Sequence, residues 1–70
     1  MLSFEIKNSG RGIEVYCDRD GLSVLIRILE NLKANGGHRH LLSQSNGGHE
    51  LDEKTPWGKS AVGEIIINLL

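Results

Sequence analysis

The chain has 70 residues, eight basic and nine acidic, and its formal net charge is −1. This length allows a single domain over residues 1–70. The charges are interspersed and form no basic stripe, which argues against a nucleic-acid partner. The apolar stretches at 22–32 and 65–70 are too short to span a bilayer, and residues 2–12 do not have the pattern of a signal peptide. We therefore expect a cytoplasmic protein without a membrane partner.

A domain this small has a thin core, because a short chain buries only about 60% of the surface that its unfolded form exposes. Such domains usually need a disulfide, a metal or a partner subunit. Cys17 is the only cysteine, so no internal disulfide forms. Its register predicts a buried structural thiol rather than a nucleophile. A metal, a homo-oligomer or a core that just suffices remain as alternatives.

The first elements form a predicted β-hairpin. Residues 2–7 alternate apolar and polar, residues 8–12 are rich in turn formers, and the alternation resumes over 13–18. Tyr16 lies on the polar face of this hairpin. The apolar face, predicted to face the core, carries Leu2, Phe4, Ile6, Ile13, Val15 and Cys17.

A helix is predicted over about residues 19–34. Its apolar stripe has helical spacing and consists of Leu22, Leu25, Ile26, Leu29 and Leu32. Asp18 or Asp20 can cap its N-terminus, where an acidic group also suits the helix dipole. The run 35–37, Asn-Gly-Gly, supplies a left-handed stop.

The remaining chain is predicted to be extended. Strands are expected over 38–43, 49–52 and 61–70, with a turn at 44–48 and a loop at 54–59. The order is β-β-α-β-β-β, an α+β fold with a single helix packed on one face of a mostly antiparallel sheet. The residues expected on the helix side of the sheet are Phe4, Ile6, Val15, Leu25 and Leu29.

The last predicted strand is apolar on both faces. Ile65 and Ile67 point one way and Ile66 the other. An open edge of this kind would be a template for aggregation. The strand is therefore expected at the centre of the sheet, or paired across a dimer interface.

Three histidines are the residues closest to a metal-site pattern. His38 and His40 project from the same face of a predicted strand, and His49 could lie across from them in a hairpin. With a nearby carboxylate they could bind zinc, although the spacing of a closed structural site is missing. The favoured interpretation is that they are surface or partner-contact residues, with no cofactor.

Catalytic motifs are not apparent in this sequence. The Gly-Gly pairs lack the spacing and the lysine of phosphate-binding loops and are typical of turns. No nucleophile with a matching base is apparent, so we do not expect an enzyme. Trp57, the only tryptophan, is predicted either to cover the end of the core or to anchor an interface, and Tyr16 has the same two interpretations.

The sequence resembles one family of small α+β proteins. The resemblance is carried by Asp-Arg-Asp-Gly-Leu at 18–22, His-Arg-His-Leu at 38–41, Gly-Gly-His-Glu-Leu at 47–51 and Gly-Glu-Ile-Ile-Ile at 63–67. This succession is similar to that of the immunity protein 32 type of bacterial polymorphic toxin systems. It departs from the expected pattern at Asn46, where the family has a tryptophan, and at Arg39, where it has an apolar residue. The resemblance implies a protein that binds and neutralises a cognate toxin.

We therefore expect a binding module that inhibits a toxin by occluding its active site or substrate surface. The acidic residues of the predicted contact set would suit a basic nuclease toxin. The alternatives are a metal-binding or metal-sensing domain built on His38, His40 and His49, and a structural homodimer. The residues expected to contact the partner are Tyr16, His38, His40, His49, Glu50, Asp52, Glu53 and Trp57.

Overall fold

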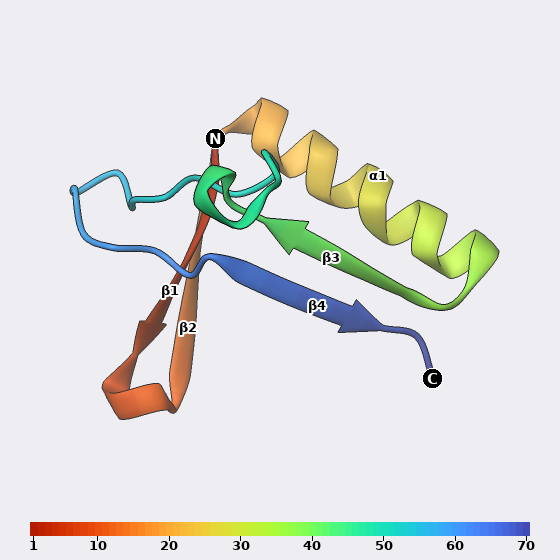
Figure 1. Ribbon diagram of the computed structural model, residues 1–70, viewed down its shortest axis with the longest axis horizontal. Coiled ribbons are helices and arrows are strands. Elements are labelled where there is room, and N and C mark those ends of the chain that lie inside the picture. Colours follow the sequence, from red (N-terminus) through yellow and green to blue (C-terminus); the bar gives the residue numbers. More distant parts are fainter.

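The computed structural model describes residues 1–70 as one long helix, four strands and two short 3-10 helices (Figure 1). The α+β class and the chain order of the elements are confirmed. The short strand predicted over 49–52 is reduced to one isolated bridge between Ser43 and Leu51. The elements are β1 (Leu2–Lys7), η1 (Asn8–Gly10), β2 (Gly12–Cys17), α1 (Arg19–Asn35), β3 (His38–Leu42), η2 (Gln44–Asn46) and β4 (Glu64–Asn68).

The strands form two antiparallel two-stranded sheets, β1–β2 and β3–β4. In Figure 1 the hairpin of β1 and β2 extends away from β3 and β4. The connection before β4 explains the separation, because it occupies the outer edge of β1. The N–H of Asp52 donates to the Leu2 carbonyl and the N–H of Val62 donates to the Phe4 carbonyl, each at 2.8 Å. β4 consequently pairs with β3 and not with the hairpin.

Helix α1 begins and ends as its sequence predicts. The N-cap is Asp18, whose Oδ1 accepts the N–H of Gly21 at 2.8 Å. At the other end Gly36 has φ 72° and donates its N–H to the Leu32 carbonyl at 2.8 Å. The observed end at Asn35 lies one residue beyond the predicted range.

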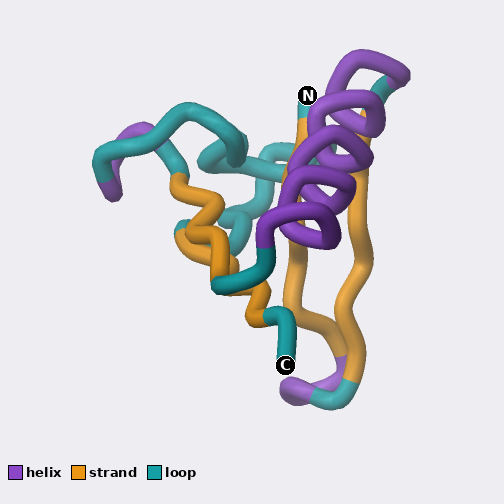
Figure 2. Tube along the Cα trace, turned by 90° about the vertical axis from the view of Figure 1, so that its right-hand side faces the viewer, coloured by secondary structure: helices purple, strands orange, loops and turns teal.

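The hydrophobic core is small and lies where α1 meets one end of each sheet. Four buried side chains form it: Leu2, Ile28, Leu41 and Leu51. The partly buried residues packed against this cluster are Phe4, Val24, Leu25, Ile65 and Ile67. Figure 2 shows the two pairs of strands lying apart from each other.

Part of the predicted helix-facing surface is exposed. Phe4 and Leu25 pack on the core as expected, but Ile6 is 60% exposed, Val15 47% and Leu29 43%. For Ile6 and Val15 the reason is that only the Leu2 end of the hairpin reaches the core, and the rest of the hairpin extends past it (Figures 1 and 2). Cys17, predicted to be buried, is exposed on the outer strand β2.

Strand β4 is an edge strand. It pairs with β3 on one side only, in a register that sets His38 opposite Asn68 and Leu42 opposite Glu64. The expected central position is therefore wrong within this chain. β4 carries isoleucine on both faces, and one of its edges has no neighbouring strand in this chain.

Candidate functional site

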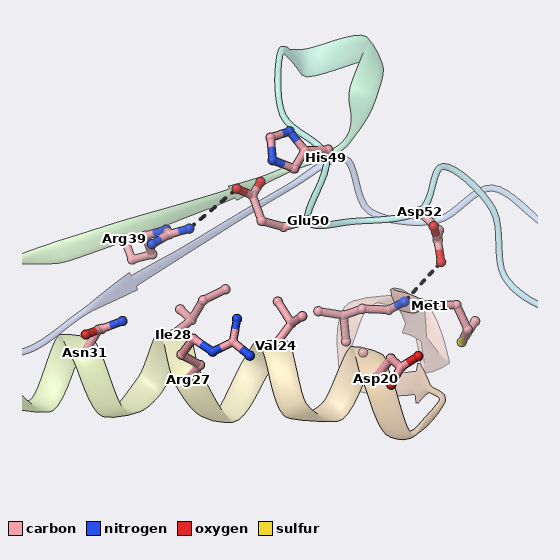
Figure 3. A pocket seen from close by; sticks show the side chains of 12 residues that line it. Met1, Asp20, Val24, Arg27, Ile28, Asn31, Arg39, His49, Glu50 and Asp52 are labelled. Carbon is pink, nitrogen blue, oxygen red and sulfur yellow. Dashed lines mark hydrogen bonds and ion pairs between the residues drawn. The ribbon is translucent and has the colours of Figure 1, made fainter.

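A groove of about 450 Å³ lies between α1 and the segment that follows η2. Figure 3 shows Arg39, His49 and Glu50 on one side and Val24, Arg27 and Asn31 on the helix. Its floor is apolar, since Leu2 and Ile28 belong to the core. The groove thus combines an apolar floor with a charged rim.

Glu50 lines this groove, and each of its two carboxylate oxygens has a partner in the chain. Its Oε1 accepts the N–H of Leu42 at 3.0 Å, and its Oε2 lies 3.5 Å from Nη2 of Arg39. The hydrogen bond from the Leu42 N–H lowers the pKa of Glu50, although partial burial opposes this effect. Glu50 therefore ties the segment after η2 to strand β3 as an ionised carboxylate.

The other two acidic residues predicted to contact a partner also bind the chain itself. Asp52 Oδ2 accepts the N–H of Leu2 at 3.0 Å. Glu53 accepts the N–H of Ser45 at 2.7 Å and the Ser45 hydroxyl at 2.8 Å, and these bonds lower the pKa of Glu53. The structure thus uses Glu50, Asp52 and Glu53 to hold the loops on the core.

Tyr16 and Trp57 form an aromatic pair that the sequence did not predict. Their ring centroids are 6.4 Å apart and the ring planes are nearly perpendicular, at 89°. The Tyr16 hydroxyl donates to Glu5 Oε1 at 3.0 Å. The carboxylates of Glu14 and Glu5, together with desolvation, raise the pKa of Tyr16 to about 12. Trp57 is 72% exposed, so the pair presents an indole to the solvent.

The structure brings His38 and His40 together on one face of β3, as their spacing predicted. Their ring centroids are 5.1 Å apart on the face of the β3–β4 sheet that also carries Ile66, which lies opposite His40. His40 Nδ1 is 3.3 Å from Glu64 Oε2. His49 lies elsewhere, at the groove. No group of three or more His, Cys, Asp or Glu side chains is positioned for a metal ion, so the three-histidine site is not assembled.

The largest feature that the sequence reasoning missed is an uncovered apolar surface on the hairpin. Ile6 and Ile13 are paired across the strands and are 60% and 63% exposed, and Val15 is 47% exposed. We call these three residues the hairpin surface. One signal could have revealed it, because a single helix of this length already has to cover β3, β4 and the loops. Apolar residues at the far end of a hairpin are then left outside the core.

The helix has an uncovered apolar flank of its own. Leu22, Ile26 and Leu29 are each more than two-fifths exposed. At 100° per residue they lie on the side of α1 opposite Arg27, which lines the groove. The chain has eleven exposed large hydrophobic residues and five buried hydrophobic residues. Exposed apolar side chains that adjoin one another are typical of interaction surfaces.

No family model, curated protein or solved structure matches this chain. Helix α1 lacks the combination of length and apolar character that a membrane-spanning helix needs.

Proposed function

We propose that this chain is a protein-binding module that neutralises a cognate toxin, as its resemblance to immunity proteins implies. The single observation that carries protein binding is the hairpin surface, formed by Ile6, Ile13 and Val15. These side chains are neighbours on one face of an antiparallel pair, and each is between 47% and 63% exposed.

The energetics favour a macromolecular partner at the hairpin surface. Complete burial of an aliphatic side chain of this size contributes about 1.5–3 kcal/mol. Three such side chains, each about half exposed or more, leave several kcal/mol of burial free energy available to a partner. The β1–β2 ladder already holds their backbone in place, so little conformational entropy is lost on binding.

The chemistry around the hairpin surface also suits recognition of a protein. A partner contact typically has an apolar centre, a polar rim and few charges at the centre. The opposite face of the same hairpin carries Tyr16, with Trp57 packed against its ring. An exposed tryptophan beside a tyrosine is a frequent interface anchor. Both faces of the hairpin can therefore contact one partner. The η1 turn lies at the end of the hairpin, between β1 and β2.

The test is co-expression with the protein encoded by the gene adjacent to this one. We expect the two proteins to co-purify and the chain to relieve the toxicity of its partner. Ile13→Asp places a charge at the centre of the hairpin surface and should abolish both effects. Ser23→Asp is the matched control, because it adds the same charge at an exposed helix position outside the hairpin.

Two results would refute the proposal. One is that the adjacent protein neither binds the chain nor is toxic in its absence. The other is that Ile13→Asp, folded by circular dichroism, binds and protects as well as Ser23→Asp does.

A further inference from the structure

The free edge of β4 is the second unpartnered feature, and it is independent of the hairpin surface. In an antiparallel pair, alternate residues direct their N–H and C=O groups to the partner strand. The N–H of Ser43 donates to the Gly63 carbonyl at 3.0 Å, and the N–H of Leu69 donates to the Gly37 carbonyl at 2.9 Å. The backbone N–H and C=O groups of the odd-numbered residues of β4 are therefore directed to β3. The backbone groups of Glu64, Ile66 and Asn68 are directed to the free edge.

This edge has none of the devices that usually block strand addition. Natural edge strands carry lysine, proline or a bulge, or are covered by a loop. β4 reads Glu-Ile-Ile-Ile-Asn and is paired in continuous register with β3. Its only charge, on Glu64, already lies 3.3 Å from His40 Nδ1. The edge is therefore open to another strand.

The sequence of β4 is complementary to itself about a two-fold axis at Ile66. If β4 pairs antiparallel with a second β4 centred there, Ile66 lies opposite its own copy and Glu64 lies opposite Asn68 of the second copy. No like charges meet, and Asn68 can accept or donate hydrogen bonds opposite the carboxylate. Ile65 then lies opposite Ile67 of the second copy, on the face that packs toward the core. The apolar row of each sheet would continue into the other.

The chain exposes more surface than a compact monomer of its mass. Its accessible surface is 5074 Å². A compact monomer of 7.7 kDa is expected to expose about 4,300 Å². The radius of gyration of 12.2 Å also exceeds the value of about 11 Å expected for a compact domain of this length.

We infer that the chain forms a two-fold symmetric homodimer in which the β4 strands pair antiparallel about Ile66, giving a four-stranded sheet in the order β3–β4–β4–β3. The partner is a second copy of this chain, since an isologous interface requires a self-complementary surface and β4 supplies one. The pairing would satisfy the N–H and C=O groups of Glu64, Ile66 and Asn68 in both copies. The paired residues, Glu64 to Asn68, do not include the hairpin surface.

Sedimentation and amide hydrogen exchange test the inference together. We expect a dimer that dissociates on dilution, and slow exchange at the Ile66 and Asn68 amides only at concentrations where the dimer is present. The Ile65 and Ile67 amides, which face β3, should be protected at every concentration and serve as the internal reference.

Two variants separate the edge from the rest of the molecule. Ile66→Lys adds a charge to a side chain that is 47% exposed and should yield a folded monomer. Ile66→Pro removes the N–H at the centre of the free edge, where the β3 ladder does not use it, and should also yield a monomer. Ile13→Asp, in contrast, should remain dimeric, which keeps this result separate from the toxin-binding test. A wild-type chain that is monomeric at all concentrations, or a dimer unaffected by Ile66→Lys with a rapidly exchanging Ile66 amide, overturns the inference.

Discussion

The carboxylate of Glu50 accepts the backbone N–H of Leu42 at 3.0 Å, and through this bond the segment after η2 is fastened to β3. The contact spans eight positions along the chain and is partly buried. A residue that the sequence suggested as a partner contact thus stabilises the fold that carries the groove. This relationship makes stability depend on the charge of Glu50.

Glu50→Gln should reduce stability at neutral pH by about 1 kcal/mol, because the amide oxygen still accepts the Leu42 N–H but lacks the negative charge. The pKa of Glu50 is lower in the folded chain than its ordinary value of 4.5. The unfolded state therefore binds more protons near that pH, and the stabilisation is present above pH 4.5 and lost as the pH falls through the folded pKa.

Chemical denaturation of both proteins across about pH 3 to 7, a range that brackets the ordinary glutamate pKa, checks this. The difference in unfolding free energy between wild type and variant should shrink toward the acid end. Glu30→Gln is the control, since Glu30 is an exposed helix residue. A difference that is constant with pH would contradict the assigned role of Glu50.

Tyr16 should titrate at a pH well above that of an exposed tyrosine. Glu14 and Glu5 disfavour the tyrosinate and raise the pKa of Tyr16 to about 12, from 10. The neutral hydroxyl thus contributes stability that is complete below pH 10 and is lost as the pH rises through 12. Because the chain has one tyrosine, ultraviolet absorbance follows this group alone.

Glu14→Gln and Glu5→Gln should each shift the Tyr16 titration toward 10, while Glu64→Gln on the other sheet should leave it unchanged. A folded wild-type chain whose Tyr16 titrates at 10 would contradict the assigned contacts of the Tyr16 hydroxyl with Glu14 and Glu5.

Gly48→Ala should destabilise the chain by about 2 kcal/mol through steric overlap. A Cβ at Gly48 would lie 2.5 Å from the Cβ of Leu42 and 2.8 Å from both the Leu42 carbonyl oxygen and Glu50 Oε1. The backbone of β3 cannot yield without disturbing the Glu50 bond. Thermal unfolding measures the loss. Gly12→Ala is the matched control, because its nearest new contact is the flexible Asn8 side chain at 3.2 Å. Equal effects of the two substitutions would argue against the close packing of Gly48 on β3.

Ser3→Ala should stabilise the chain by about 1 kcal/mol. The Ser3 side chain is completely buried, and its hydroxyl has no hydrogen-bond partner. Ser43 provides an internal comparison, since it is equally buried but its Oγ accepts from Asn46 Nδ2 at 3.0 Å. Ser43→Ala should therefore destabilise. The two substitutions should shift the midpoint of urea unfolding in opposite directions, and shifts of the same sign would contradict the assigned hydrogen bonding.

The sequence was sufficient to predict every element whose signal is local. The period-two alternation predicted β1 and β2, and the helical stripe with Asp18 before it and Gly36 after it predicted α1. Caps, turns and periodicity depend on backbone preferences within a few residues, so a single sequence expresses them. The pairing of His38 with His40 could also be predicted, because residues two apart in a strand share a face.

The tertiary structure decided how the strands group, which apolar residues are covered and what the acidic side chains do. The β1–β2 and β3–β4 sheets are separate because the connection from Asp52 to Val62 occupies the edge of β1. This grouping of the strands depends on hydrogen bonds between segments that are tens of residues apart in sequence, so no local pattern encodes it. It leaves Ile13 exposed although this residue has the pattern of a core residue. Glu50 and Glu53 accept the backbone N–H groups of Leu42 and Ser45, which lie on the other side of the η2 turn.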